Sequence, residues 1–221
     1  IVEADVVVAP DWLALLSGVL ASSGAVGAGG ALRPFPGAPW PARLAGYEVQ
    51  SRQESQRDQT ILHVSSANVL YTRKAWELAG PFREDLMNAS LDSDFNARLL
   101  AAGERLAWEP RATAWHHYKP GVSGFLLRTL AYARTRWQVS NLALYPGDRD
   151  LAPRLLLDAL ACSAPAWGTW APPLALAAWV AALGGHLPLA WEVLRQRRDP
   201  AALLLPPFLV LRGGVGAAGL A

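Results

Sequence analysis

The feature that most limits how this chain can fold is a run of 33 residues, 159–191, that contains no Asp, Glu, Lys or Arg. A helix needs about 20 predominantly apolar residues to cross the hydrocarbon core of a bilayer. Pro165, Pro172 and Pro173 interrupt the run, and proline breaks or kinks a helix from within. We therefore expect at least one membrane span, best placed over residues 174–191, with the earlier part kinked, re-entrant or forming one arm of a short hairpin. The alternative is a buried core helix.

Positive charge follows the apolar run. Three arginines lie within residues 195–198, and loops rich in Lys and Arg tend to stay on the cytoplasmic side of a membrane. The pattern predicts a cytoplasmic loop and makes membrane lipid an expected partner. A second apolar stretch, 201–211, is expected to be broken by Pro206 and Pro207.

Composition excludes several classes of protein. The hydrophobic share is 52% and the charged share only 17%, against roughly 25% charged residues in a typical soluble domain, so a disordered chain is excluded. The net charge of +2 is too small to indicate a nucleic-acid partner. The single cysteine, Cys162, rules out an internal disulfide and a cysteine-based zinc site. Any metal must therefore be held by carboxylates and histidines.

The chain divides into an α/β region, residues 1–140, and a hydrophobic helical region, residues 141–221. It opens on a strand pattern without a methionine, which predicts that it begins inside a fold. Strands are expected over 1–8, 25–32, 61–72, 105–108 and 112–117, and helices over 10–24, 73–79, 91–102 and 122–139, the last a candidate interfacial helix. Residues 33–41 are expected to form a loop, and residues 50–59 an exposed helix or mobile loop.

Glu3 and Asp5 form an acidic pair on the first predicted strand. Residues two apart on a strand leave the same face, and two acids among apolar residues are costly unless a cation compensates them. Mg²⁺ or Mn²⁺ prefers oxygen ligands and often binds substrate phosphates. The pair is therefore a candidate anchor for a nucleotide diphosphate, and the alternative is a solvated strand end.

Two further pairs of residues have side chains suited to acid–base catalysis or metal binding. Asp92 and Asp94 fall in the first turn of the helix predicted over 91–102, where the helix dipole favours negative charge, but a carboxylate fixed there also suits a general base. His116 and His117 end a predicted strand and point to opposite faces, so at most one enters a given site. That histidine can help to bind Mn²⁺, although a structural role is the alternative.

Four motifs, taken in order, resemble the latter half of a family 2 glycosyltransferase with a GT-A fold. They are Glu3-Ala-Asp5, then Ser66-Ala-Asn68 with Arg73 and Gly80-Pro-Phe82, then Leu91-Asp92-Ser-Asp94-Phe-Asn-Ala-Arg-Leu99, and Ala114-Trp-His116-His117. The resemblance implies that Glu3, Asp5, Asn68 and Arg73 bind the nucleotide-diphosphate sugar donor, that Asp5 and His116 or His117 bind Mg²⁺ or Mn²⁺, and that Asp92 is the catalytic base with Asp94 in reserve. Glu3 replaces the usual first Asp, and Leu91 the usual Glu before the base.

The implied activity is metal-dependent, inverting transfer of a sugar from a nucleotide-diphosphate sugar to a hydroxyl of a glycan or lipid-linked acceptor, in cell-envelope or lipid-linked glycan synthesis. Ala133 stands where processive members carry Gln before Arg136-Trp137, which favours a single transfer. The resemblance places the protein in the cell membrane with its catalytic domain in the cytoplasm. It also predicts that the family's first half is missing and that the fragment alone is inactive. The alternatives are a non-catalytic or degenerate membrane-associated partner protein and a membrane-attached metal-dependent phosphohydrolase.

Overall fold

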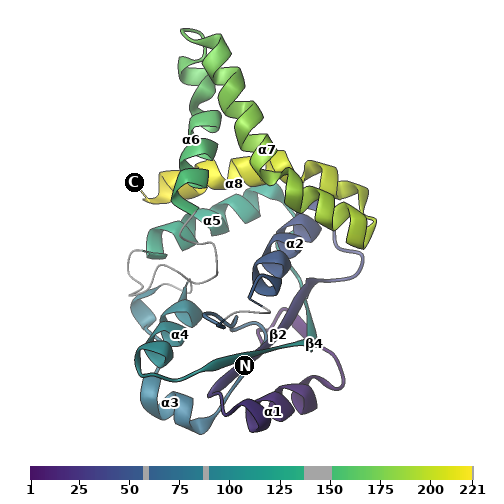
Figure 1. Cartoon of the computed structure of the whole chain (residues 1–221), viewed down its shortest axis with the longest axis vertical. Coiled ribbons are helices and arrows are strands. Elements are labelled where there is room, and N and C mark those ends of the chain that lie inside the picture. Colours follow the sequence, from purple (N-terminus) through teal and green to yellow (C-terminus); the bar gives the residue numbers. More distant parts are fainter. Residues whose placement is uncertain (57–59, 87–89, 137–150, 221) are drawn as a thin grey trace. The chain divides into compact units, whose positions relative to one another are not determined.

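The computed structural model describes residues 1–56, 60–86, 90–136 and 151–220 (Figure 1). The chain forms two compact units, one of Ile1–Tyr118 with Thr135–Pro146 and one of Lys119–Arg134 with Gly147–Ala221. The boundary expected between residues 140 and 141 lies outside the described residues, as do the ends of the segments predicted over 50–59 and 122–139.

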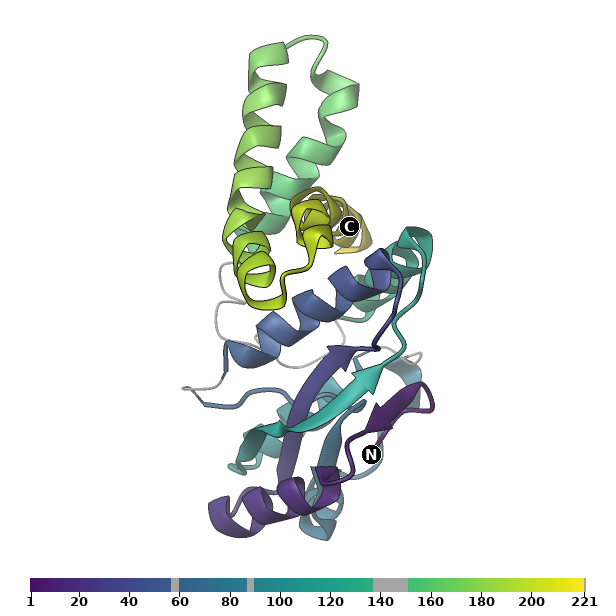
Figure 2. The same cartoon turned by 90° about the vertical axis from the view of Figure 1, so that its right-hand side faces the viewer.

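The first unit contains a four-stranded mixed sheet in the order β1-β4-β2-β3. The strands are β1 (Val6–Val8), β2 (Gly27–Pro34), β3 (Val69–Tyr71) and β4 (Leu106–His116). β4 and β2 run parallel in the middle, and β1 and β3 pair antiparallel at the edges (Figure 2). With helices on the sheet, this unit confirms the predicted α/β class.

Helices cover both faces of this sheet. Leu70 packs in a cluster with α1 (Trp12–Ser23), whereas its neighbour Val69 packs with α3 (Arg73–Ala79) and α4 (Leu91–Ala101) on the opposite face. This division follows from the strand geometry, because successive side chains on a strand point to opposite faces. All three helices lie where the sequence predicts them. A short 3-10 helix, η1, covers Glu84–Leu86 between α3 and α4.

The expected strand over 61–72 is wrong except at Val69–Tyr71, which form β3. The reason is a buried glutamine. Gln56 accepts hydrogen bonds from the backbone N–H groups of Leu62 and His63, at 3.0 and 3.1 Å, and donates to the His63 carbonyl at 3.0 Å. These backbone groups are therefore satisfied without a neighbouring strand.

The two strands expected over 105–108 and 112–117 are instead one strand, β4, whose register with β2 shifts between Gly30 and Leu32. A Cβ atom on Gly30 would meet the carbonyl oxygen of Ala112 at 2.0 Å. Only glycine permits this close approach of the two backbones. The irregularity allows the two halves of β4 to stay in one sheet.

Helix α2 covers Trp40–Glu54. The loop expected over 33–41 therefore ends before residue 40, and the segment expected to be exposed from residue 50 begins inside this helix. Gln50, Gln53 and Gln56 are buried, with exposed fractions of 4% or less. The Gln53 side chain accepts a hydrogen bond from the Leu32 backbone N–H of β2 at 3.0 Å. The amide side chains of Gln53 and Gln56 face the protein because they satisfy backbone groups of other segments.

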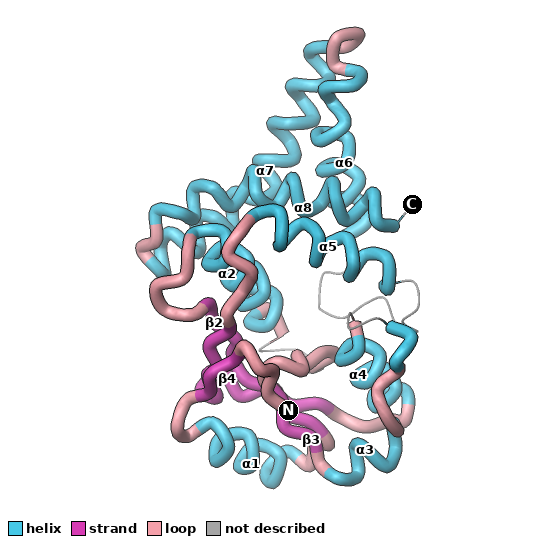
Figure 3. The backbone as a smooth tube through the Cα atoms, turned by 180° about the vertical axis from the view of Figure 1, so that it is seen from behind, coloured by secondary structure: helices cyan, strands magenta, loops and turns pink. Residues whose placement is uncertain are grey.

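The second unit is helical, with α5 (Val122–Arg136), α6 (Leu151–Trp167), α7 (Pro172–Arg197), the 3-10 helix η3 (Pro200–Leu204) and α8 (Leu205–Leu220). α6 and α7 form a helical hairpin (Figure 3). This arrangement matches one of the three expectations for the charge-free run, in which its earlier part forms one arm of a hairpin. Pro206 and Pro207 do not break the following stretch but lie in the first turn of α8. Proline is tolerated there because the first N–H groups of a helix have no intrahelical partner.

Two helical segments among the described residues, Pro172–Arg197 and Pro200–Ala218, are long and apolar enough to cross a membrane. Only 11% of the most apolar window of the first is buried in the protein, against 50% for the second. Five large apolar side chains of α7 are more than half exposed: Leu174, Leu176, Val180, Leu187 and Trp191. A buried core helix would cover such side chains with protein.

Candidate metal centre and adjacent carboxylate

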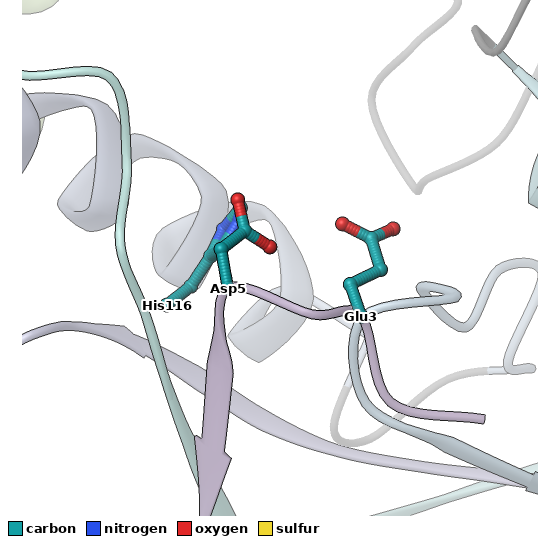
Figure 4. A group of neighbouring side chains, drawn as sticks. All are labelled: Glu3, Asp5 and His116. Atoms are coloured by element: carbon teal, nitrogen blue, oxygen red, sulfur yellow. The ribbon is translucent and has the colours of Figure 1, made fainter.

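Glu3, Asp5 and His116 come together beside β1 and the end of β4 (Figure 4). Their potential ligand atoms all lie within 4.8 Å of one another. Glu3 and Asp5 precede β1 in a turn closed by the Val6 N–H donating to the Glu3 carbonyl at 3.1 Å, so the expected strand position of the acids is wrong. The turn nevertheless brings both acids to the same histidine.

His116 is positioned by pairing of its strand. It lies opposite Val6 in the antiparallel ladder of β1 and β4, and its side chain is 2% exposed. Its Nε2 atom lies 3.3 Å from Asp5 Oδ2. His117 donates its backbone N–H to the Asp5 carbonyl, but its exposed ring stacks on Phe35 with centroids 3.8 Å apart. Of the two histidines, the structure brings His116 to the acids and not His117.

The donor set suits a hard divalent cation. Two carboxylates and one imidazole match the ligands of Mn²⁺, and the carboxylates match those of Mg²⁺. Asp5 is 45% exposed while His116 is buried, so the group is open to solvent on the carboxylate side. Glu3, Asp5 and His116 are therefore a candidate divalent-cation site.

Asp92 lies in the first turn of α4 and is held by three residues. Its Oδ2 atom accepts the Ser66 backbone N–H at 3.1 Å, its Oδ1 atom accepts the Ser93 N–H at 2.8 Å, and His63 Nε2 lies 3.7 Å from Oδ2. Burial raises the pKa of Asp92. The charge and hydrogen bonding of His63, together with the two backbone amides, lower it by more than burial raises it, so the pKa is about 2. Asp92 is thus an ionised carboxylate at neutral pH.

One residue connects Asp92 to the acidic cluster. The Ser66 hydroxyl donates to Glu3 Oε1 at 2.7 Å, while the Ser66 N–H donates to Asp92. The carboxylate of α4 and the carboxylate before β1 are therefore separated by a single serine.

Asp94 points elsewhere, as helical geometry predicts for residues two apart. Its side chain is 4% exposed and pairs with Arg98 Nε at 2.9 Å and Arg83 Nη1 at 3.5 Å. Arg98 in turn donates to the carbonyl groups of Ala79 and Pro81. Asp94 thus joins α4 to the segment after α3.

Two sequence candidates for donor binding, Asn68 and Arg73, do not belong to the group of acids and histidine. Asn68 is fully buried. Its amide donates to the carbonyls of Ala31 and Ala112 at 3.0 and 3.1 Å and accepts from Trp12 Nε1 at 2.5 Å. Arg73 is exposed and begins α3 beyond the other end of β3.

Sequence reasoning missed His63, which is 7% exposed and also lies 3.3 Å from the Ser93 hydroxyl. A strand was expected over this segment, and on a strand His63 would have been one residue among alternating side chains. Its position three residues before Ser66 was the one signal that linked it to the motifs.

Comparisons with known proteins do not assign the chain to a family. No protein-family model matches the sequence, and no curated protein matches it at a significant level.

Proposed function

We propose that this protein is a metal-dependent glycosyltransferase that transfers a sugar from a nucleotide-diphosphate sugar to an acceptor hydroxyl with inversion. The observation that carries the proposal is the convergence of Glu3, Asp5 and His116 within 4.8 Å, with Asp92 one serine away. These residues come from three of the four motifs that resemble family 2 glycosyltransferases.

In the proposed reaction, Glu3, Asp5 and His116 hold Mg²⁺ or Mn²⁺, which when bound neutralises charge on the departing diphosphate. The acceptor oxygen bonds to the anomeric carbon as the bond from that carbon to the diphosphate oxygen breaks. The hydroxyl proton passes to Asp92. A pKa of about 2 suffices for this step, because an attacking hydroxyl becomes strongly acidic as its oxygen gains a second carbon bond.

The orientation of Asp92 supports this role. The N–H groups of Ser66 and Ser93 bind different oxygens of its carboxylate, and His63 approaches Oδ2 from a third direction. A carboxylate held by fixed donors is positioned before substrate arrives, and such orientation lowers the barrier to proton transfer. One displacement at the anomeric carbon inverts its configuration.

We further propose that the first unit is the latter half of a GT-A domain and that the helical unit anchors it, with the catalytic domain in the cytoplasm. The mixed sheet with helices on both faces supports the first part. The exposed apolar side chains of α7, followed by Arg195, Arg197 and Arg198, support the second.

The test is calorimetric binding of UDP and GDP to the complete protein in detergent, with and without Mn²⁺. We expect one of these diphosphates to bind only with Mn²⁺, and Asp5→Ala to abolish binding. Arg111→Ala, which changes an arginine paired with Glu109 at 2.9 Å, is the control and should bind normally. Metal-independent binding, or binding unaffected by Asp5→Ala, would contradict the proposal and favour a non-catalytic partner protein.

A further inference from the structure

Ser66 touches both carboxylate groups of the site through two different groups. Its hydroxyl oxygen lies 2.7 Å from Glu3 Oε1 and 3.5 Å from Asp92 Oδ2, and its backbone N–H lies 3.1 Å from Asp92 Oδ2. A serine hydroxyl has a single hydrogen. The shorter contact uses that hydrogen, so the hydroxyl serves Glu3 while the backbone serves Asp92.

The turn that carries Ser66 is fixed by the core on both sides. Val64 and Asn68 are buried, and the Asn68 N–H closes the turn on the Ser65 carbonyl at 2.9 Å. The Asn68 side chain then binds two carbonyls of the central strand region, those of Ala31 and Ala112. Ser66 therefore presents its donors from a rigid position rather than from a free loop.

Glu3 needs such a support more than a shorter acid would. It lies in the turn before β1, where its side chain has three rotatable bonds, and it accepts a hydrogen bond from the Ser66 hydroxyl. A carboxylate has two oxygens, so a donor on Oε1 orients the group while Oε2 stays available to a cation. Hydrogen-bond partners of metal ligands orient the ligand and raise metal affinity in this way.

We propose that Ser66 is a positioning residue of the cation site: its hydroxyl holds Glu3 in place to bind a divalent cation, and its backbone N–H sets Asp92 beside that site. This inference rests on the proposed function, because it takes Glu3, Asp5 and His116 as the cation ligands. It predicts that loss of the hydroxyl alone weakens cation binding.

The experiment measures the affinity of the full chain in detergent for Mn²⁺ alone, by electron paramagnetic resonance of free Mn²⁺. Ser66→Ala removes the hydroxyl and keeps the backbone N–H, and we expect binding about 10- to 100-fold weaker. Ser66→Thr restores a hydroxyl and should recover most of the affinity. Ser65→Ala is the matched control, since the Ser65 hydroxyl accepts from the nearby Ala67 N–H at 3.4 Å and is not part of the candidate cation group, and it should bind Mn²⁺ as the wild type does.

A double-mutant cycle separates positioning from a general loss of structure. Glu3→Asp shortens the side chain that reaches Ser66, so Glu3→Asp and Ser66→Ala disrupt the same contact. Their combined fold-change should be smaller than the product of the two single fold-changes. A combined fold-change in Mn²⁺ affinity equal to the product of the single fold-changes would overturn the proposal. So would a Ser66→Ala protein with both weaker Mn²⁺ binding and a lower thermal unfolding midpoint, if Ser66→Thr did not restore the affinity.

The outcomes also distinguish this inference from the proposed function. If Asp5→Ala abolishes Mn²⁺ binding but Ser66→Ala binds like the wild type, the positioning role of Ser66 is wrong and the cation site stands. If the wild type binds no Mn²⁺, or Asp5→Ala binds it normally, both the cation site and the role of Ser66 are wrong.

Discussion

The Nε2 atom of His63 lies 3.7 Å from the Oδ2 atom of Asp92, and both side chains are largely buried. The same nitrogen lies 3.3 Å from the hydroxyl of Ser93, the residue after Asp92. An imidazole thus supports the start of α4 from the irregular segment before β3. Burial raises the pKa of Asp92, and His63 opposes that shift together with the backbone N–H groups of Ser66 and Ser93.

His63→Gln should raise the pKa of Asp92 above its wild-type value of about 2. The substitution removes the positive charge and hydrogen bonding of His63, while burial, which raises the pKa, remains. Titration of the Asp92 carboxyl carbon by NMR measures the change. His117→Gln is the control, because the His117 ring stacks on Phe35 away from Asp92, and it should leave this titration unchanged.

Asp92 should stabilise the fold at neutral pH and lose that contribution in acid. Its pKa is lowered on folding from 3.8 to about 2, so the stabilisation is present above pH 3.8 and disappears as the pH falls to about 2. The difference corresponds to about 2 kcal/mol in the free energy of unfolding. Denaturant titrations followed by circular dichroism at pH 6 and pH 2 should show this loss in wild type, and Asp92→Asn should lack that part of the pH dependence.

Asp92→Asn should lower kcat on the order of 10²-fold or more, with donor KM little changed, as expected for loss of a general base. Steady-state release of nucleoside diphosphate by the complete enzyme measures both constants. An amide cannot accept the proton but preserves the size of the side chain.

Asp94→Asn is the matched comparison. It breaks the ion pairs that the buried Asp94 carboxylate forms with Arg98 and Arg83, so we expect a loss of about 1–3 kcal/mol in stability and near-normal kcat in the folded fraction. An equal collapse of kcat in Asp94→Asn, with near-normal turnover in Asp92→Asn, would reverse the assignment of the base.

Asn68→Ala should cost about 2–4 kcal/mol of stability, because it leaves the carbonyls of Ala31 and Ala112 and the Trp12 indole N–H without this partner in the core. Thermal unfolding measures the effect. Arg73→Ala, at an exposed position, should change stability by no more than about 0.5 kcal/mol. A stable Asn68→Ala protein that binds donor poorly would instead support direct donor binding by Asn68.

The intact protein should remain with membranes after extraction with high salt and with alkaline carbonate. α7 exposes five large apolar side chains over a length sufficient to cross a bilayer. Fractionation followed by immunoblotting is the measurement. Release into the soluble fraction without detergent would show that α7 is covered by protein rather than by lipid.

The amino-acid sequence by itself determined the elements whose signals are local. Apolar periodicity placed α1 and α4, because the packed face of a helix repeats within a few residues, and the Gly80-Pro81 stop signal placed the end of α3. The same periodicity separated Asp92 from Asp94, since residues two apart on a helix cannot share a face. The charge-free run likewise indicated the long apolar helix α7.

Only the tertiary structure decided the groups that depend on contacts between distant segments. Gln56 replaces a strand partner for residues 62 and 63, and apolar periodicity does not reveal a side chain that binds backbone outside its own element. The pairing of β4 with β1 selected His116 over His117. The turn at Ser66 joined Glu3 to Asp92. Hydrogen bonds between segments are set when the core packs, whereas the periodicity of a sequence indicates only which side of its own element a residue occupies.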